Sequence, residues 1–207
     1  MQLNELERLM RNVAAVRPIF HSEADFQHAF AWQLHAAHPK ARIRLETRPA
    51  PGVRVDVLAT IDGRRVAFEL KYLVRGITVT IDDELFELPN QGAQDLRRYD
   101  FVKDVARLEV MLRDGATDEG YAIALTNDPS YWQSGDYARF IDAAFRIDEG
   151  RKIEGVLHWA AHAGAGTMRG RENPISLTGS YDAGWRDFSV LPDARYGSFR
   201  YLAVAVS

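Results

Sequence analysis

Apolar side chains recur at helical spacing in two stretches near the start of the chain. In the first, residues 3–16, they fall on roughly one face, which predicts an amphipathic helix. These positions are Leu3, Leu6, Leu9, Val13 and Val16. Pro18 follows and ends the predicted helix, because a proline cannot continue the helical hydrogen bonding.

The second stretch predicts a helix that starts at Ser22. The segment Ser-Glu-Ala-Asp there resembles a capping box in which Asp replaces the usual Glu. Phe26, Phe30 and Leu34 give this helix an apolar stripe, and Pro39 ends it.

The pattern then changes to short runs typical of strands. Strands are predicted at Ile43–Thr47, Val53–Ile61, Arg65–Tyr72, Ile77–Ile81 and Glu84–Leu88. A long helix follows from about Gln91 to Leu112, then a buried strand over Glu119–Thr126 and another helix over Asp136–Phe145.

Beyond residue 150 the periodicity weakens. Strands are predicted at Ile153–Ala160, Ile175–Thr178, Trp185–Leu191 and Phe199–Val206, with a glycine-rich flexible loop over Ala163–Asn173. The 207 residues are enough to bury one core, and no linker or repeat is visible. A single α/β domain over residues 1–207 is the simplest interpretation.

Composition and charge narrow the function classes. The chain has no cysteine, which excludes disulfides, thiolate metal sites and a cysteine nucleophile. It shows no run of eighteen apolar residues and no signal-peptide pattern at its start, so we expect a cytoplasmic protein without a membrane span. The net charge of −3 counts against an extended nucleic-acid surface.

Local basic clusters are the exception to that charge balance. They are Arg42, Arg44, Arg48 and Arg54; Arg97, Arg98, Lys103 and Arg107; and Arg169 with Arg171. Such clusters can contact phosphates, and each can equally be a surface patch balanced by nearby acids.

One hairpin carries the main functional prediction. Asp62-Gly63 separates two alternating runs, a strong signal for a two-residue type I′ turn. Counting outward from this turn pairs apolar residues on one face and places Asp56 across from Glu69 on the other. Their Cβ atoms would then lie about 4.5–5.5 Å apart.

Two facing carboxylates repel each other, so the fold needs a compensating charge. A divalent cation such as Mg²⁺ prefers oxygen ligands and often takes only one or two carboxylates. Lys71 lies on the same face as Glu69 and can orient a water molecule or stabilise a phosphoryl group. The alternative is a solvated sheet face with mixed charges.

These residues resemble the signature of the PD-(D/E)xK nuclease superfamily. The match consists of Asp56 on one strand, Glu69-Leu70-Lys71 on the next, and the helix that precedes them. The usual proline before the Asp is replaced by Val55. The resemblance covers about residues 20–126, and residues 150–207 would be an elaboration outside that core.

The resemblance implies a restriction-endonuclease-like fold with a mixed central sheet flanked by helices. It further implies a Mg²⁺- or Mn²⁺-dependent enzyme that hydrolyses phosphodiester bonds in DNA, in defence or repair, with a homodimer as one option. Asp56 and Glu69 would bind the metal with the carbonyl of Leu70, and Lys71 would act on water.

Two further roles follow from the same resemblance. Glu23 would be the upstream acid that completes the metal shell, with Asp25 and Gln27 as competitors; it can equally be a first-turn acid that favours the helix terminus. Gln94 would support catalysis from the long helix, or be an ordinary N-terminal helix residue. The competing hypothesis for the whole chain is an inactive nucleic-acid-binding or protein-interaction module on the same fold.

Overall fold

The computed structural model describes residues 1–50 and 52–207, without the side chain of residue 50. Its helices are α1 (Leu3–Val16), α2 (Glu23–Ala37), α3 (Gln94–Arg113) and the short α4 (Ala165–Met168). Its strands are β1 (Arg42–Ala50), β2 (Val53–Ile61), β3 (Arg64–Leu73), β4 (Ile77–Ile81), β5 (Glu84–Leu88), β6 (Glu119–Thr126), β7 (Lys152–Leu157), β8 (Ile175–Asp182), β9 (Trp185–Val190) and β10 (Ser198–Val206).

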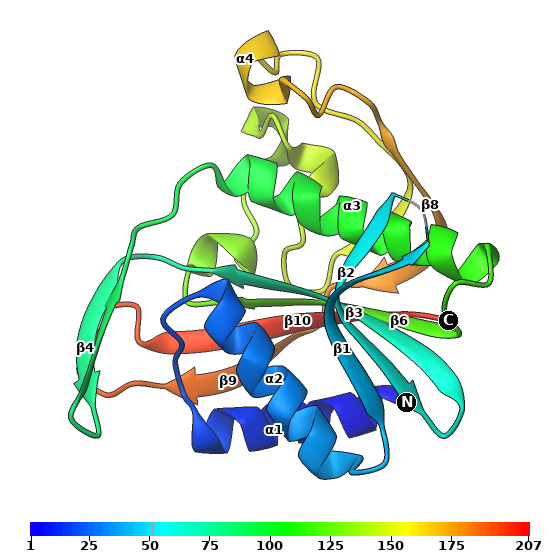
Figure 1. Cartoon of the computed structure of the whole chain (residues 1–207). Coiled ribbons are helices and arrows are strands. Elements are labelled where there is room, and N and C mark those ends of the chain that lie inside the picture. Colours follow the sequence, from blue (N-terminus) through cyan, green and yellow to red (C-terminus); the bar gives the residue numbers. More distant parts are fainter. Residues whose placement is uncertain (51) are drawn as a thin grey trace.

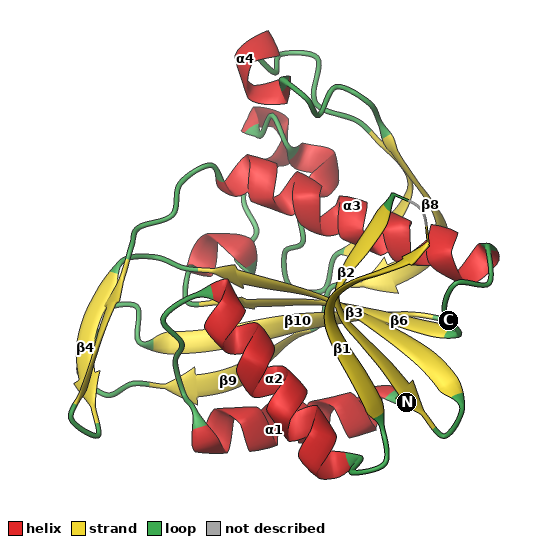
Figure 2. Cartoon of the chain, viewed as in Figure 1, coloured by secondary structure: helices red, strands yellow, loops and turns green. Residues whose placement is uncertain are grey.

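A six-stranded mixed sheet organises the chain, in the order β1-β2-β3-β6-β10-β9 (Figures 1 and 2). The central pair, β3 and β6, is parallel, and the other neighbours are antiparallel. β6 is buried at every position, as expected for a parallel strand covered on both faces. The predicted α/β class, with a mixed sheet flanked by helices, is confirmed.

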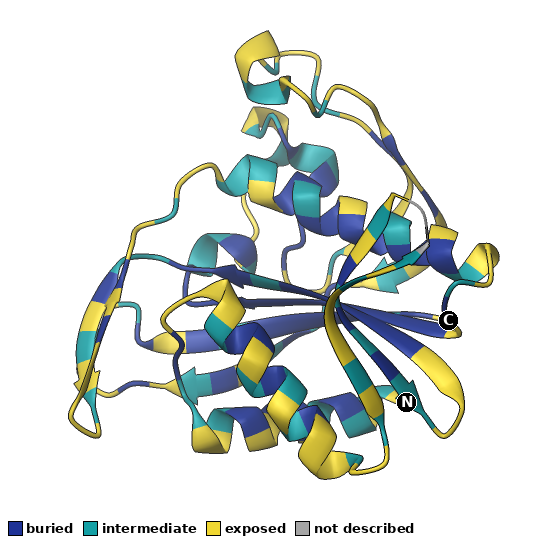
Figure 3. Ribbon diagram, in the orientation of Figure 1, coloured by how far each residue is buried: buried dark blue, intermediate teal, exposed yellow. Residues whose placement is uncertain are grey.

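Helices cover both faces of this sheet (Figure 1). α1 and α2 pack on one face around Phe26, Phe30 and Phe68. α3 packs on the other face through Phe101, Val105 and Leu108, and the β7–β8 hairpin adds to that layer. Figure 3 shows the buried residues concentrated along the central strands and the inner faces of these helices.

The two N-terminal helices follow the predicted pattern. Leu6, Leu9 and Val13 of α1 are buried, and α2 begins directly after Ser22. The Ser22 hydroxyl accepts a hydrogen bond from the backbone N–H of Asp25 at 3.2 Å, which satisfies one free donor of the first turn.

The predicted hairpin register is confirmed near the turn. Ile61 pairs with Arg64, and the ladder continues to the pair Val57 and Phe68. Asp62 and Gly63 both have positive φ, at 49° and 82°, as a type I′ turn requires.

Gly63→Ala is expected to lower the free energy of unfolding by about 1–2 kcal/mol, because an alanine in the left-handed region strains its backbone. No atom lies within 4 Å of the added Cβ, so the loss would come from the backbone alone. The matched control is Gly92→Ala, whose Cβ is equally free and whose φ is not in that region. Urea unfolding of both variants measures the difference; equal stabilities would contradict the turn assignment.

β2 leaves β3 at Asp56, which corrects one prediction. The pairs expected beyond Phe68, including Asp56 with Glu69, are absent from the ladder between the described strands. Val57 packs on the α1–α2 face but Val55 packs on the α3 face, so the ribbon crosses from one face to the other. Glu46, next to this point on β1, has a positive φ of 51°, consistent with a sharp bend.

Other predicted elements differ in extent. The long helix starts at Gln94 rather than Gln91, and the loop over 163–173 contains the short α4. A single helix over Asp136–Phe145 was wrong: two separate 3₁₀ turns, Tyr137–Arg139 and Ala143–Phe145, occupy it. Asp136 caps the first turn by accepting from the Ala138 N–H, and Arg98 ties Asp142 to α3, so tertiary contacts override the helical pattern.

Residues 150–207 contribute to the main sheet as well as to its cover. β10 lies between β6 and β9, inside the six-stranded sheet. Among the helices of the described ranges, none is long and apolar enough to cross a membrane.

Candidate functional site

Two carboxylates replace β2 as the partner of β3 where the strands separate. The N–H of Leu70 donates to Asp56 Oδ2 at 2.7 Å, and the N–H of Tyr72 donates to Glu23 Oε2 at 3.0 Å. Glu23 reaches this point from the exposed first turn of α2. The divergence of the strands therefore creates a gap in the ladder that acidic side chains enter.

Lys71 lies between these acids and the opposite helix. Its Nζ is 2.8 Å from Oδ2 of Asp104 on α3, and Asp104 is only 5% exposed. Burial alone would lower the pKa of Lys71, but the carboxylates of Asp104, Glu23 and Asp56 raise it above its ordinary value. Lys71 is thus a charged ammonium held among three acids.

Glu69 is the most deeply buried acid of the group, at 2% exposure. Its Oε2 lies 2.5 Å from Nη2 of Arg107 on α3, and the same guanidinium group lies 3.0 Å from Asp104. Its other oxygen, Oε1, is buried and has no hydrogen-bond partner among the described residues. A buried oxygen without a donor is costly, so a ligand that approaches Oε1 would be stabilised.

Negatively charged groups outnumber positively charged groups in this part of the structure. It contains four acids, Glu23, Asp56, Glu69 and Asp104, but only two cations, Lys71 and Arg107, which leaves a formal charge of −2 when all are ionised. We refer to these six residues as the acidic cluster.

Burial and the excess of negative charge raise the pKa values of three of the acids. Burial, the negative charge of Asp104 and that of Asp56 raise the pKa of Glu69 to about 8, against the opposing charge of Arg107. Burial is also the largest cause that raises the pKa of Asp56, with Asp104 and Glu46 adding to it. The pKa of Glu23 is raised as well, by burial of its carboxylate against β3 and by the Asp56 charge, although the residue as a whole is exposed. Such shifts are typical of sites in which charged groups are held for chemistry.

The carboxylate oxygens of the cluster are ligands of the kind that a divalent cation such as Mg²⁺ prefers. No group of three or more acidic or histidine side chains is arranged to hold a metal ion as the described residues stand. The oxygens that could hold one are those of Asp56 and Glu69, with Glu69 exchanging Arg107 for the cation. The Leu70 carbonyl is a third candidate, because a strand residue directs its N–H and C=O to the same edge.

The structure brings together most of the residues that the sequence singled out. Glu23, Asp56, Glu69 and Lys71 share one cluster, with mutual electrostatic effects on their pKa values. Asp25 lies outside it and pairs with Arg17 at 2.8 Å.

The two glutamines lie around the cluster in different ways. Gln27 supports it by donating to the Asp56 carbonyl at 2.6 Å. Gln94 donates instead to Asp128 at 3.1 Å, at the start of α3, and makes no hydrogen bond to the cluster acids.

Asp104 is the residue that sequence reasoning missed. It lies three residues after Phe101 and four before Leu108, so it belongs to the inward stripe of α3. A charged residue in such a stripe is a signal for a buried site. Arg107 was identified only as part of a basic patch, although it is three residues further along the same helix.

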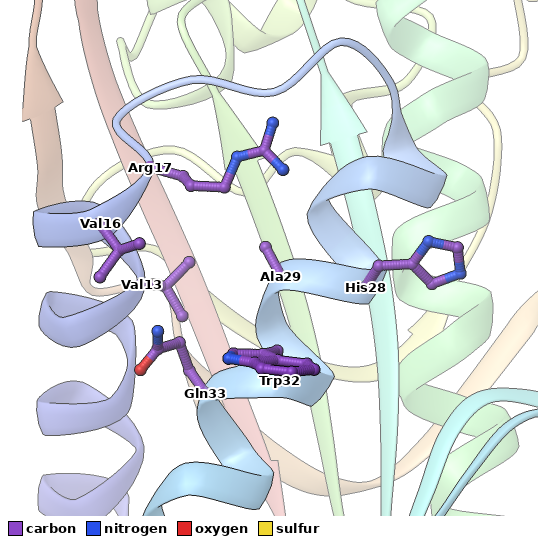
Figure 4. Close-up of a pocket in the computed structure, with 7 residues that line it drawn as sticks. All are labelled: Val13, Val16, Arg17, His28, Ala29, Trp32 and Gln33. Atoms are coloured by element: carbon purple, nitrogen blue, oxygen red, sulfur yellow. The ribbon is translucent and has the colours of Figure 1, made fainter.

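Among the pockets lined by described residues, one reaches the cluster through Arg107 and another lies apart from it. A groove of about 450 Å³ between α3 and the segment 170–176 is lined by Arg107, Lys103 and Arg171, so Arg107 connects it to Glu69. A smaller pocket between α1 and α2, shown in Figure 4, contains none of the six cluster residues.

Comparison of the chain with protein-family models, with curated proteins and with solved structures finds no match in any of the three. The geometry of the cluster is therefore the basis for inferring a function.

Proposed function

We propose that this protein is a Mg²⁺- or Mn²⁺-dependent nuclease that hydrolyses phosphodiester bonds in DNA, with its active site at the acidic cluster. One observation carries the proposal. Four acids and only two cations, Lys71 and Arg107, lie together, a formal charge of −2 when all are ionised, and Glu69 Oε1 is buried there without a hydrogen-bond partner among the described residues. A divalent cation would neutralise that charge, and a phosphodiester substrate would then face a cation and an ammonium group.

The order of the elements also supports a restriction-endonuclease-like fold. A helix, three antiparallel strands, a second helix and a strand parallel to the third follow one another as α2, β1, β2, β3, α3 and β6. This order is the core implied by the resemblance of Asp56 and Glu69-Leu70-Lys71 to the PD-(D/E)xK signature. The β4–β5 hairpin is inserted between β3 and α3.

Each residue has a distinct role in this proposal. Asp56 and Glu69 would hold the cation with the Leu70 carbonyl, and Glu23 would complete the acidic shell from α2. When bound, the cation would polarise a phosphoryl oxygen and lower the pKa of a coordinated water. Lys71, kept charged by Asp104, would orient the attacking water or stabilise charge on the phosphoryl group.

Lys71→Ala is expected to lower the rate of Mg²⁺-dependent cleavage by about 100-fold, the effect typical of losing one charge-stabilising donor. Plasmid and single-stranded DNA would be incubated with Mg²⁺, Mn²⁺ or EDTA, and the products followed on gels. The control is Lys152→Ala, an exposed lysine on β7 that pairs with Asp182 away from the cluster. Equal rates for wild type and Lys71→Ala would refute the role of Lys71.

The second candidate is a binding module on the same fold that does not cleave. The contact between Arg107 and Glu69 favours it, because that guanidinium group occupies the oxygen a cation would need. Nucleic-acid binding without cleavage in either metal, by wild type and by Arg107→Ala alike, would select this candidate over the nuclease.

A further inference from the structure

Trp32 is unusually exposed for its size. Of the four tryptophans, all within the described ranges, it alone is exposed, at 75%, while Trp185 is buried and the other two are half-buried. Leaving an indole ring in water forgoes the stabilisation that its burial would give. Trp32 also lines two pockets, one between α1 and α2 and the other between α2 and β1.

The first of these pockets is apolar and small. It has a volume of about 240 Å³ and lies between α1 and α2, with Val13 and Ala29 near the ring (Figure 4). The second, of about 570 Å³, lies between α2 and the edge strand β1. A volume in this range suits a ligand of drug or nucleotide size.

The charges around the second pocket have one sign. Its titratable lining residues are His28, His35, Arg42 and Arg44, and no acid lines it. Both arginines are exposed and form no ion pair with any described residue. In a chain with a net charge of −3, this local excess of positive charge points to an anionic partner.

The pocket connects to the acidic cluster through two elements. α2 begins at Glu23 in the cluster and reaches Trp32 nine residues later, about 13 Å along the helix axis. β1 carries Arg42 and Arg44 and then Glu46, whose charge acts on Asp56. A strand bound at the cluster would therefore reach the tryptophan within a few nucleotides.

We propose that Trp32, Arg42 and Arg44 form a second substrate-binding site, which stacks one base of a single-stranded nucleic-acid segment and binds its phosphates. This inference rests on the proposed function and specifies how the substrate strand lies. Aromatic side chains beside arginines bind single strands in this way: the ring stacks on a base, and the guanidinium groups contact phosphates. The two arginine Cα atoms, two residues apart on a strand, lie about 6.6 Å apart, so both can follow an extended backbone.

The test is a binding measurement in EDTA, in which metal-dependent cleavage cannot occur. A fluorescein-labelled oligothymidine is titrated with protein, and anisotropy is followed together with tryptophan fluorescence. Wild type should bind with quenching, and Trp32→Ala should weaken binding by about 5- to 150-fold and remove most of the quenching. The matched control is Val190→Ala, another exposed apolar residue, on β9.

The arginines are tested by the salt dependence of the same binding. Replacing both Arg42 and Arg44 with Ala should reduce the slope of log affinity against log salt by about 1.4, at about 0.7 for each phosphate contact on a single strand. Arg139→Ala, with a side chain 84% exposed on a different segment, should leave the slope unchanged.

The inference would be overturned if oligothymidine did not bind, or if Trp32→Ala left its binding intact. It would also be overturned if polyglutamate, and not oligothymidine, bound through Trp32, Arg42 and Arg44. Its failure is separable from failure of the nuclease. Normal binding at Trp32 without cleavage in Mg²⁺ or Mn²⁺ would refute only the nuclease, and cleavage insensitive to Trp32→Ala would refute only the second site.

Discussion

Asp56→Asn is expected to lower the rate of Mg²⁺-dependent DNA cleavage by about 1,000-fold, with little change in stability. The fold should persist because an asparagine oxygen can still accept the hydrogen bond that Asp56 Oδ2 takes from the Leu70 N–H. What the substitution removes is one negative charge from the cation site. A bound cation supplies several kcal/mol of charge stabilisation in the transition state, and about 4 kcal/mol corresponds to this loss in rate.

The matched control for this variant is Asp118→Asn. Asp118 also accepts a strand N–H, that of Arg65 at 2.7 Å, but it lies near the turn between α3 and β6 rather than in the cluster. Single-turnover cleavage with Mg²⁺ measures both variants, and thermal unfolding checks their folds. Full activity of Asp56→Asn, or equal losses in the two variants, would contradict the assignment of Asp56.

Glu69→Gln is expected to stabilise the metal-free protein at alkaline pH. The pKa of Glu69 rises from 4.5 to about 8 on folding. The folded state therefore binds more protons than the unfolded state between these values, and stability falls as pH rises through that window. At about 1.36 kcal/mol per pKa unit, ionised Glu69 costs the folded protein on the order of a few kcal/mol above pH 8.

Thermal unfolding in EDTA at pH 5 and pH 8.5 measures this effect. The variant should melt several degrees above wild type at pH 8.5 and close to it at pH 5. Mn²⁺ should reverse the order at pH 8.5, because a cation that binds only the folded wild type adds stability by mass action. Glu87→Gln on exposed β5 is the control, and an equal melting difference at both pH values would contradict the raised pKa.

The sequence was sufficient to predict the elements that local signals determine. Helical spacing located α1 and α2, and the positive φ values required at Asp62 and Gly63 set the register of the hairpin. The α/β class followed from the succession of these elements, whereas the mixed sheet was expected only from the resemblance to a known family. Glu23, Asp56, Glu69 and Lys71 were expected at one place, and they lie there.

The features that the sequence did not predict depend on contacts between residues far apart in the chain. The alternation of apolar and polar residues along β2 does not predict that β2 leaves β3 at Asp56. Val55 and Val57 are equally apolar, yet they pack on opposite faces of the sheet. The contacts of Asp104 with Lys71 and Arg107 depend on where α3 crosses the sheet, which no local pattern specifies. The predicted helix over 136–145 failed for the same reason, since Arg98 of α3 binds Asp142 within it.

Anomalous density from a crystal soaked in Mn²⁺ at pH 8 would show whether the acidic cluster binds a divalent cation. We expect one peak within about 2.0–2.2 Å of oxygens from both Asp56 and Glu69, with Arg107 withdrawn from Glu69. The contradicting result is a crystal in which Arg107 still pairs with Glu69 and manganese binds elsewhere or not at all.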